Sequence, residues 1–115
     1  MNIIIKTKNI ELTPSLRDFV EEKIGSLEKY FNLLQIDDDP ALGATIDAVV
    51  EVGKTTMHHR KGNISRAEVL LTFHRNTIRA AKSADDLEAA VIAVHDDLQR
   101  QLTDFKEKKI EKARR

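Results

Sequence analysis

The sequence predicts a single α+β domain whose elements follow the order β-α-β-β-β-α. Apolar residues alternate with polar ones in four short segments, which is typical of half-buried strands. They recur at helical spacing in two longer segments, which is typical of amphipathic helices. The 115 residues, 41% of them hydrophobic, suffice for one continuous core but not for a second domain. We therefore expect a four-stranded sheet with both helices on one face.

The first two elements are a strand over residues 2–8 and a helix over residues 14–34. Thr13 and Pro14 mark the helix start, because the hydroxyl can accept from a free first-turn amide and proline is favoured at the first helical position. Residues 37–43 hold turn formers and a proline, and are predicted to be a loop. The helix is supported by one apolar stripe at Leu16, Val20, Ile24, Leu27, Phe31 and Leu34.

Three further strands are predicted over residues 45–52, 66–73 and 77–82. A long basic connection at 53–63 and a tight turn at 74–77 join them. Side chains alternate between the two faces of a strand, so each strand has one apolar face for the helices and one polar face for solvent. The polar face is expected to carry Asp47, Glu51, Arg66, Glu68 and Thr72.

The second helix follows Ser83 to Asp86, which fits the serine-x-x-acid capping pattern. Its core contact should end near Phe105. We therefore divide the chain into a domain at 1–108 and a basic C-terminal tail at 109–115, for which helix and frayed chain both remain open. The apolar stripe of this helix consists of Leu87, Val91, Val94, Leu98, Leu102 and Phe105.

Several classes of function are not expected from the composition. There is no cysteine, which excludes disulfides and thiolate chemistry. No apolar run is long enough for a membrane span, and residues 1–15 lack a signal core, so we expect a cytoplasmic protein. The adjacent His58 and His59 stand far from the other histidines, so no metal site is predicted. Without a phosphate-binding glycine loop or nucleophile motif, we expect no enzyme, no cofactor and no small-molecule substrate.

The charges are segregated along the chain, although their sum is zero. Residues 37–52 carry five acids and no base, whereas residues 54–82 carry seven bases and one acid. The final segment, 106–115, carries six bases and two acids. Screening confines a field to about 10 Å at ordinary salt, so local blocks matter more to a polyanion than the sum does.

Three segments resemble one known family. They are residues 10–31 (IELTPSLRDFVEEKIGSLEKYF), 77–91 (TIRAAKSADDLEAAV) and 97–109 (DLQRQLTDFKEKK). In order and spacing they are similar to the ribosome hibernation-promoting factors, also called ribosome-associated translation inhibitors or the sigma-54 modulation family. The chain ends at Arg115 without the extra domain of long-form members, so we expect a short form.

The resemblance implies a fold similar to a double-stranded-RNA-binding domain and binding to rRNA of the small ribosomal subunit. It also implies occupation of the mRNA and tRNA channel in the intact ribosome, and hibernation under stress or in stationary phase. Two further departures from the family's pattern stand out. Residues 37–43 look like an insertion, and Glu88 and Asp97 stand where members often have tyrosine and lysine.

Two groups of candidate rRNA-binding residues come from helix 1 and strand 4. Lys23 lies between Phe19 and Tyr30 on one flank of the first helix, and such interleaving suits phosphate pairing and base stacking. The alternative is that both aromatic rings seal the core edge while the lysine extends to water. Arg79 and Lys82 lie on the last strand and could contact phosphate or remain solvated.

The third group lies on the second helix and consists of Arg100, Lys106, Lys108 and Lys109. Bases at a helix end also stabilise its dipole, and Arg100 could pair with Asp96 or Asp104. We expect the three groups to form one basic surface. The alternative function is a protein-interaction module that uses the exposed, mixed-charge face of the sheet.

Overall fold

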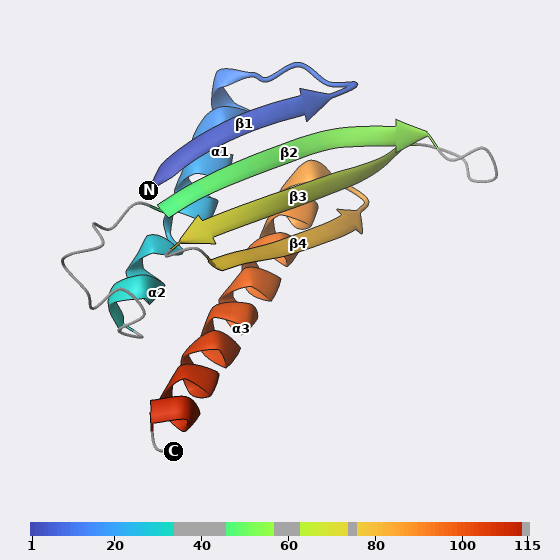
Figure 1. The fold of residues 1–115 in the computed structure, drawn as a ribbon. Coiled ribbons are helices and arrows are strands. Elements are labelled where there is room, and N and C mark those ends of the chain that lie inside the picture. Colours follow the sequence, from blue (N-terminus) through green and yellow to red (C-terminus); the bar gives the residue numbers. More distant parts are fainter. Residues whose placement is uncertain (34–45, 57–62, 74–75, 114–115) are drawn as a thin grey trace.

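A computed structural model describes residues 1–33, 46–56, 63–73 and 76–113 (Figure 1). The α+β class and the predicted element order are confirmed, except that the first helix is divided in two. The elements are β1 (Asn2–Lys8), α1 (Pro14–Gly25), α2 (Glu28–Leu33), β2 (Ile46–Thr56), β3 (Asn63–Phe73), β4 (Asn76–Ala84) and α3 (Leu87–Ala113).

The four strands form one mixed sheet in the order β1-β2-β3-β4. β1 pairs with β2 in parallel, because α1 and α2 carry the chain back between them, and the other two pairs are antiparallel. One row across the sheet joins Ile3, Ala48, Leu71 and Ile78 on the face toward the helices. All four predicted strands are present, and the last three extend beyond their predicted bounds.

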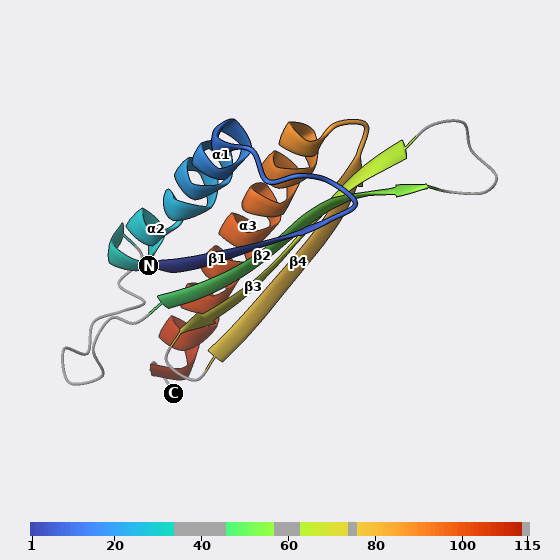
Figure 2. The ribbon, with the colours of Figure 1, turned by 90° about the horizontal axis from the view of Figure 1, so that it is seen from above.

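All three helices cover the same face of the sheet, as Figure 2 shows. The core lies between these two layers, and both predicted apolar stripes contribute to it over the part that the structure describes. The opposite face carries the polar residues predicted for it. The buried apolar residues are Val20, Ile24, Leu27, Phe31, Ile46, Ala48, Val50, Val52, Ala67, Val69, Leu71, Phe73, Ala80, Ala90, Val91, Val94, Leu98 and Leu102.

The prediction of one continuous helix over 14–34 is wrong. α1 ends at Gly25 and α2 begins at Glu28, and at the break the amide of Leu27 donates to the carbonyl of Ile24 at 3.0 Å. The Ser26 hydroxyl donates to the carbonyl of Lys23 at 2.6 Å, and such side-chain bonds compete with helical ones. Because Leu27 remains fully buried after the break, the apolar periodicity did not reveal it.

One of the two predicted helix starts is confirmed and the other is displaced. The Thr13 hydroxyl accepts from the amide of Leu16 at 3.2 Å, as expected of an N-cap. At α3, however, Asp86 is the cap, and its carboxylate accepts from the amide of Ala89 at 2.7 Å. Ser83 instead lies within β4, because pairing with β3 continues through it.

Three aromatic rings pack together where β3 ends, between α2 and α3. Phe73 of β3 makes edge contacts with Phe31 of α2 and Phe105 of α3, at ring-centroid distances of 4.9 and 5.3 Å. α3 continues past this cluster to Ala113 and projects beyond the sheet (Figure 1). Residues 109–113 of the predicted tail are therefore helical. The predictions made for Leu34, the 37–43 loop, His58, His59 and residues 74–75 lie outside the described residues.

Candidate nucleic-acid interface

The first candidate group lies where α1 and α2 meet α3. Phe19 and Tyr30 are half-buried and pack against the core, and Gln99 of α3 donates to the Tyr30 hydroxyl. Both rings therefore contact the edge of the core, and Tyr30 belongs to α2. The role of Tyr30 in rRNA binding stays a prediction. Lys23 is half-buried beside Phe19 and Ser26, and among the described residues its ammonium group has no ion-pair partner.

A buried histidine links the helix break to α3. The Nε2 nitrogen of His95 lies 3.2 Å from the Ser26 hydroxyl, and Nδ1 lies 3.0 Å from the carboxylate of Asp96. The same hydroxyl donates to the carbonyl of Lys23, so Ser26 joins the backbone of α1 to the imidazole ring on α3. This network fixes the backbone beneath Lys23. No spacing in the sequence pointed to it, because Ser26 and His95 meet only through tertiary packing.

Arg79 and Lys82, the second candidate group, do not share a face of the sheet. Arg79 is registered with Leu70, so it lies on the outer face. Lys82 is registered with the buried Ala67 and lies on the side of the helices, at the exposed β4 edge. An odd spacing along a strand places two side chains on opposite faces. A partner that binds one face of the sheet therefore cannot contact both Arg79 and Lys82 on that face.

Arg79 takes part in a charged triad on the outer face. Its Nε donates to Glu68 at 3.1 Å, and Arg66 donates to the other oxygen of Glu68 at 3.1 Å. The hydrogen bond from Arg79 and, after it, the charges of both arginines hold the pKa of the Glu68 carboxyl below its usual value of 4.5, although partial burial opposes them. The carboxylate thus offsets part of the positive charge that Arg79 could offer a phosphate.

Arg100, on α3, is also occupied by acids. Its guanidinium donates to Asp97 at 2.5 Å and to Asp104 at 3.4 Å. Pairing with Asp104 was one of the predicted alternatives, whereas Asp96 contacts His95 instead. Two carboxylates beside one guanidinium reduce its net attraction for phosphate.

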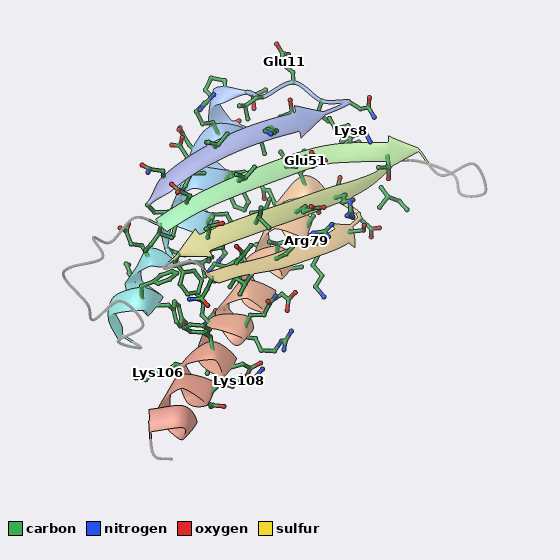
Figure 3. All side chains as sticks on the ribbon, viewed as in Figure 1. Lys8, Glu11, Glu51, Arg79, Lys106 and Lys108 are labelled. Atoms are coloured by element: carbon green, nitrogen blue, oxygen red, sulfur yellow. The ribbon has the colours of Figure 1, made fainter. Side chains whose placement is uncertain are left out.

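The end of α3 carries the candidates with free charges. Lys106 is half-buried and Lys108 is exposed, and the part of the chain described here contains no ion-pair partner for either. Residues two apart on a helix point in nearly opposite directions, and Figure 3 shows the two lysines on different sides of α3. Lys109 lies in the same helix, but its side chain is outside the described set. Lys106 and Lys108 thus place positive charge on two sides of the projecting helix, with the exposed Glu107 between them in the sequence.

The described parts of the chain contain neither a metal-binding cluster nor a membrane-spanning helix. No group of three or more histidine, aspartate or glutamate side chains there is arranged to hold a metal ion. None of the helices described has the length and apolar content to cross a bilayer.

Comparison with solved structures gives close matches to the fold. The N-terminal domain of Protein Y from Thermus thermophilus superimposes with a TM-score of 0.71 and 26% identity, over 91% of this chain and 99% of that one. A ribosomal subunit interface protein from Coxiella burnetii gives a TM-score of 0.66 at 17% identity, over 93% and 99%, and so supports the fold alone.

Comparison with other sequences gives relatives and a family. The chain is 33% identical over 98 residues to a ribosome hibernation promotion factor of Staphylococcus aureus (strain COL), and 32% identical over 108 residues to that of Bacillus subtilis (strain 168). These alignments cover 85% and 94% of this chain but 44% and 50% of the relatives, so it spans about half their length. The family model described as "Sigma 54 modulation protein / S30EA ribosomal protein" matches residues 3–110. Because that match covers most of the sequence, the chain belongs to this family.

Proposed function

We propose that this chain binds the small ribosomal subunit through rRNA, occupies the channel of mRNA and tRNA, and so promotes ribosome hibernation. Membership of the family supports the ribosome as partner. The relatives from Staphylococcus aureus and Bacillus subtilis are named ribosome hibernation promotion factors, which supports hibernation as the result of binding. The action is competition by occupancy, with no covalent chemistry.

The observation that carries this proposal is the basic end of α3. The helix extends past the aromatic cluster around Phe105, so its last turns have no sheet beneath them. The side chains of Lys106 and Lys108 lie on different sides of α3. A helix end of this kind, inserted between two phosphate backbones, could contact both of them. Unlike Arg79 and Arg100, neither lysine has an ion-pair partner among the described residues, although Glu107 stands between them in the sequence.

Sedimentation with purified small subunits at several salt concentrations tests the proposal. Each phosphate contact releases counterions, so the affinity should fall steeply with salt. The double substitution Lys106→Ala with Lys108→Ala should weaken binding and reduce the salt slope by about two units. Translation in vitro should be inhibited by the parent protein and restored as initiation components are raised.

A control pair removes the same charge elsewhere. Lys6→Ala with Lys8→Ala changes two exposed lysines of β1, away from the end of α3 (Figure 3 labels Lys8). This pair should reduce binding less. Equal losses from both pairs would mean diffuse attraction, and no loss from either would contradict the rRNA contact. Inhibition that persisted after the protein was stripped from the ribosome would contradict occupancy.

A second candidate function is suggested by the outer face of the sheet. Ile4, Val49 and Leu70 are adjacent in register across three strands, and Ile4 and Leu70 are 56% and 39% exposed. An apolar row with charged neighbours suits a protein partner. Binding through this row should be insensitive to salt and lost in Ile4→Ser with Leu70→Ser, whereas the rRNA contact should tolerate that change.

A further inference from the structure

A groove opens at the end of the molecule opposite the basic helix end, where α1 and α3 both begin. It has a volume of about 760 Å³ and is bounded by the segment after β1, the first turns of both helices and the ends of β2 and β3. Figure 3 shows Glu11 of its rim far from Lys106 and Lys108. Of the three candidate rRNA-binding groups, only Phe19 contributes to its lining, and none of their lysines or arginines does.

The floor of the groove is apolar and incompletely covered. Ile10, Leu16, Phe19 and Leu87 line it, and each of them is only half-buried while packed against the core. A side chain of leucine size placed there would remove apolar surface of both molecules from water. The groove therefore favours a ligand with an apolar anchor.

The rim carries a strong excess of negative charge. Among the described residues that line it, four exposed carboxylates, those of Glu11, Asp85, Asp86 and Glu88, stand against one ammonium, that of Lys54. Asp86 caps α3, but within the described parts of the chain none of the other three has an ion-pair partner. Asp85, Asp86 and Glu88 lie at the start of α3, where an anion would otherwise be attracted, so phosphate is repelled and a cationic ligand is favoured.

One buried polar group in the groove has no hydrogen-bond partner in the part of the chain that the structure describes. Ser65 lines the groove and is 1% exposed. It belongs to the same alternating set of β3 as the buried Ala67 and Val69, so its side chain points toward the helix layer and into the groove. No hydrogen bond of its hydroxyl is found among the described residues. Buried hydroxyls normally have a partner, so this one is suited to a ligand.

From these observations we propose that the groove binds a basic segment of a partner protein, in which an apolar side chain enters the groove and flanking lysines or arginines meet the acidic rim. The rim supplies the charge complementarity, the floor takes the anchor, and Ser65 bonds the peptide. The two ends of the molecule thus bind different partners: the acidic groove binds a cationic segment, and the basic end of α3 binds anionic rRNA. This proposal does not rest on ribosome binding, and its test uses no ribosome.

Fluorescence anisotropy with a labelled synthetic peptide, a single leucine flanked by lysines, tests the site. The parent protein should bind it, and Glu11→Gln with Glu88→Gln should weaken binding up to about tenfold, as expected for two partly exposed ion pairs. The matched control, Asp47→Asn with Glu51→Gln, removes the same charge from the outer face and should leave affinity within about twofold of the parent.

Ser65→Ala separates a ligand-binding role from a structural one. Loss of one hydrogen bond should weaken the peptide about fivefold. Because the hydroxyl has no hydrogen-bond partner among the described residues, the melting temperature should stay the same or rise. A loss of stability without a loss of affinity would contradict the assignment of Ser65.

Three outcomes would overturn the proposal. A peptide with serine in place of leucine could bind equally well, which would mean diffuse charge attraction only. An RNA oligonucleotide could displace the peptide, which would make the groove a nucleic-acid site. The chain could self-associate in a way abolished by Glu11→Gln with Glu88→Gln, which would make a second copy the occupant.

Discussion

The two faces of the sheet differ in what they tolerate. The face toward the helices is built from residues such as Val50, Val69 and Leu71, which have no exposed surface at all. The outer face carries the Arg66, Glu68 and Arg79 triad and an exposed apolar row. The inner face therefore specifies the fold, and the outer face is free to evolve contacts with partners.

The largest effect should come from a charge placed in the layer between helices and sheet. Leu98→Asp and Leu27→Asp each put an unpaired carboxylate at a position with no exposed surface. The cost should exceed about 4 kcal/mol, against a total stability of about 5–15 kcal/mol for a domain of this kind. Circular dichroism should show loss of the cooperative melt.

A charge reversal on the outer face is the matched control for both substitutions. Glu51→Lys changes an exposed side chain and should shift the stability by at most about 1 kcal/mol. A parent-like melt for Leu27→Asp or Leu98→Asp would mean that the helix faces are assigned incorrectly.

A smaller loss of stability should come from replacing Gly53, because the neighbouring strand leaves no room for a side chain there. A Cβ atom at this position would lie 2.4 Å from the carbonyl oxygen of Lys8 in the paired strand β1. Gly53→Ala should therefore force β1 and β2 apart and cost about 1–3 kcal/mol in chemical denaturation.

Gly25 provides the control for that substitution. A Cβ there would meet Ile3 at 3.8 Å, an ordinary contact, and alanine is a better helix former than glycine. Gly25→Ala should leave stability unchanged or raise it by up to about 1 kcal/mol. Equal destabilisation by both substitutions would argue against the close approach of β1 to β2.

The element order could be predicted from the sequence because each element has one buried face. The α3 stripe from Leu87 to Phe105 and the alternation in β2 and β3 are both recovered in the buried core. The helix break could not be predicted. It depends on Ser26, whose hydroxyl contacts Lys23 and His95, and the second contact spans a large distance in sequence.

The candidate site was predictable in part. The spacing of Arg79 and Lys82 already implies opposite faces of a strand, which does not fit the expectation of one common basic surface. The pairing of Arg100 with Asp104 follows from helical spacing and was foreseen as an alternative. The acidic groove was not predictable, because Glu11 and Glu88 come together only when α1 and α3 pack side by side.

The smallest predicted effect concerns the charged triad on the outer face. The pKa of the Glu68 carboxyl is lowered in the folded protein, so ionised Glu68 stabilises the fold above about pH 4.5 and loses this contribution as the pH falls through the folded-state value. Glu68→Gln removes the ion pairs with Arg66 and Arg79 and should cost at most about 1 kcal/mol at neutral pH.

The pH dependence distinguishes the ion pairs from simple packing. The difference in melting temperature between parent and Glu68→Gln should shrink toward zero as the pH is lowered below the Glu68 pKa, because the parent carboxyl is then neutral as well. High salt at neutral pH should shrink it in the same way. A difference that stayed constant with both pH and salt would assign the effect to side-chain shape. Arg79 would then not be held by Glu68 and would be free to meet a phosphate on the outer face.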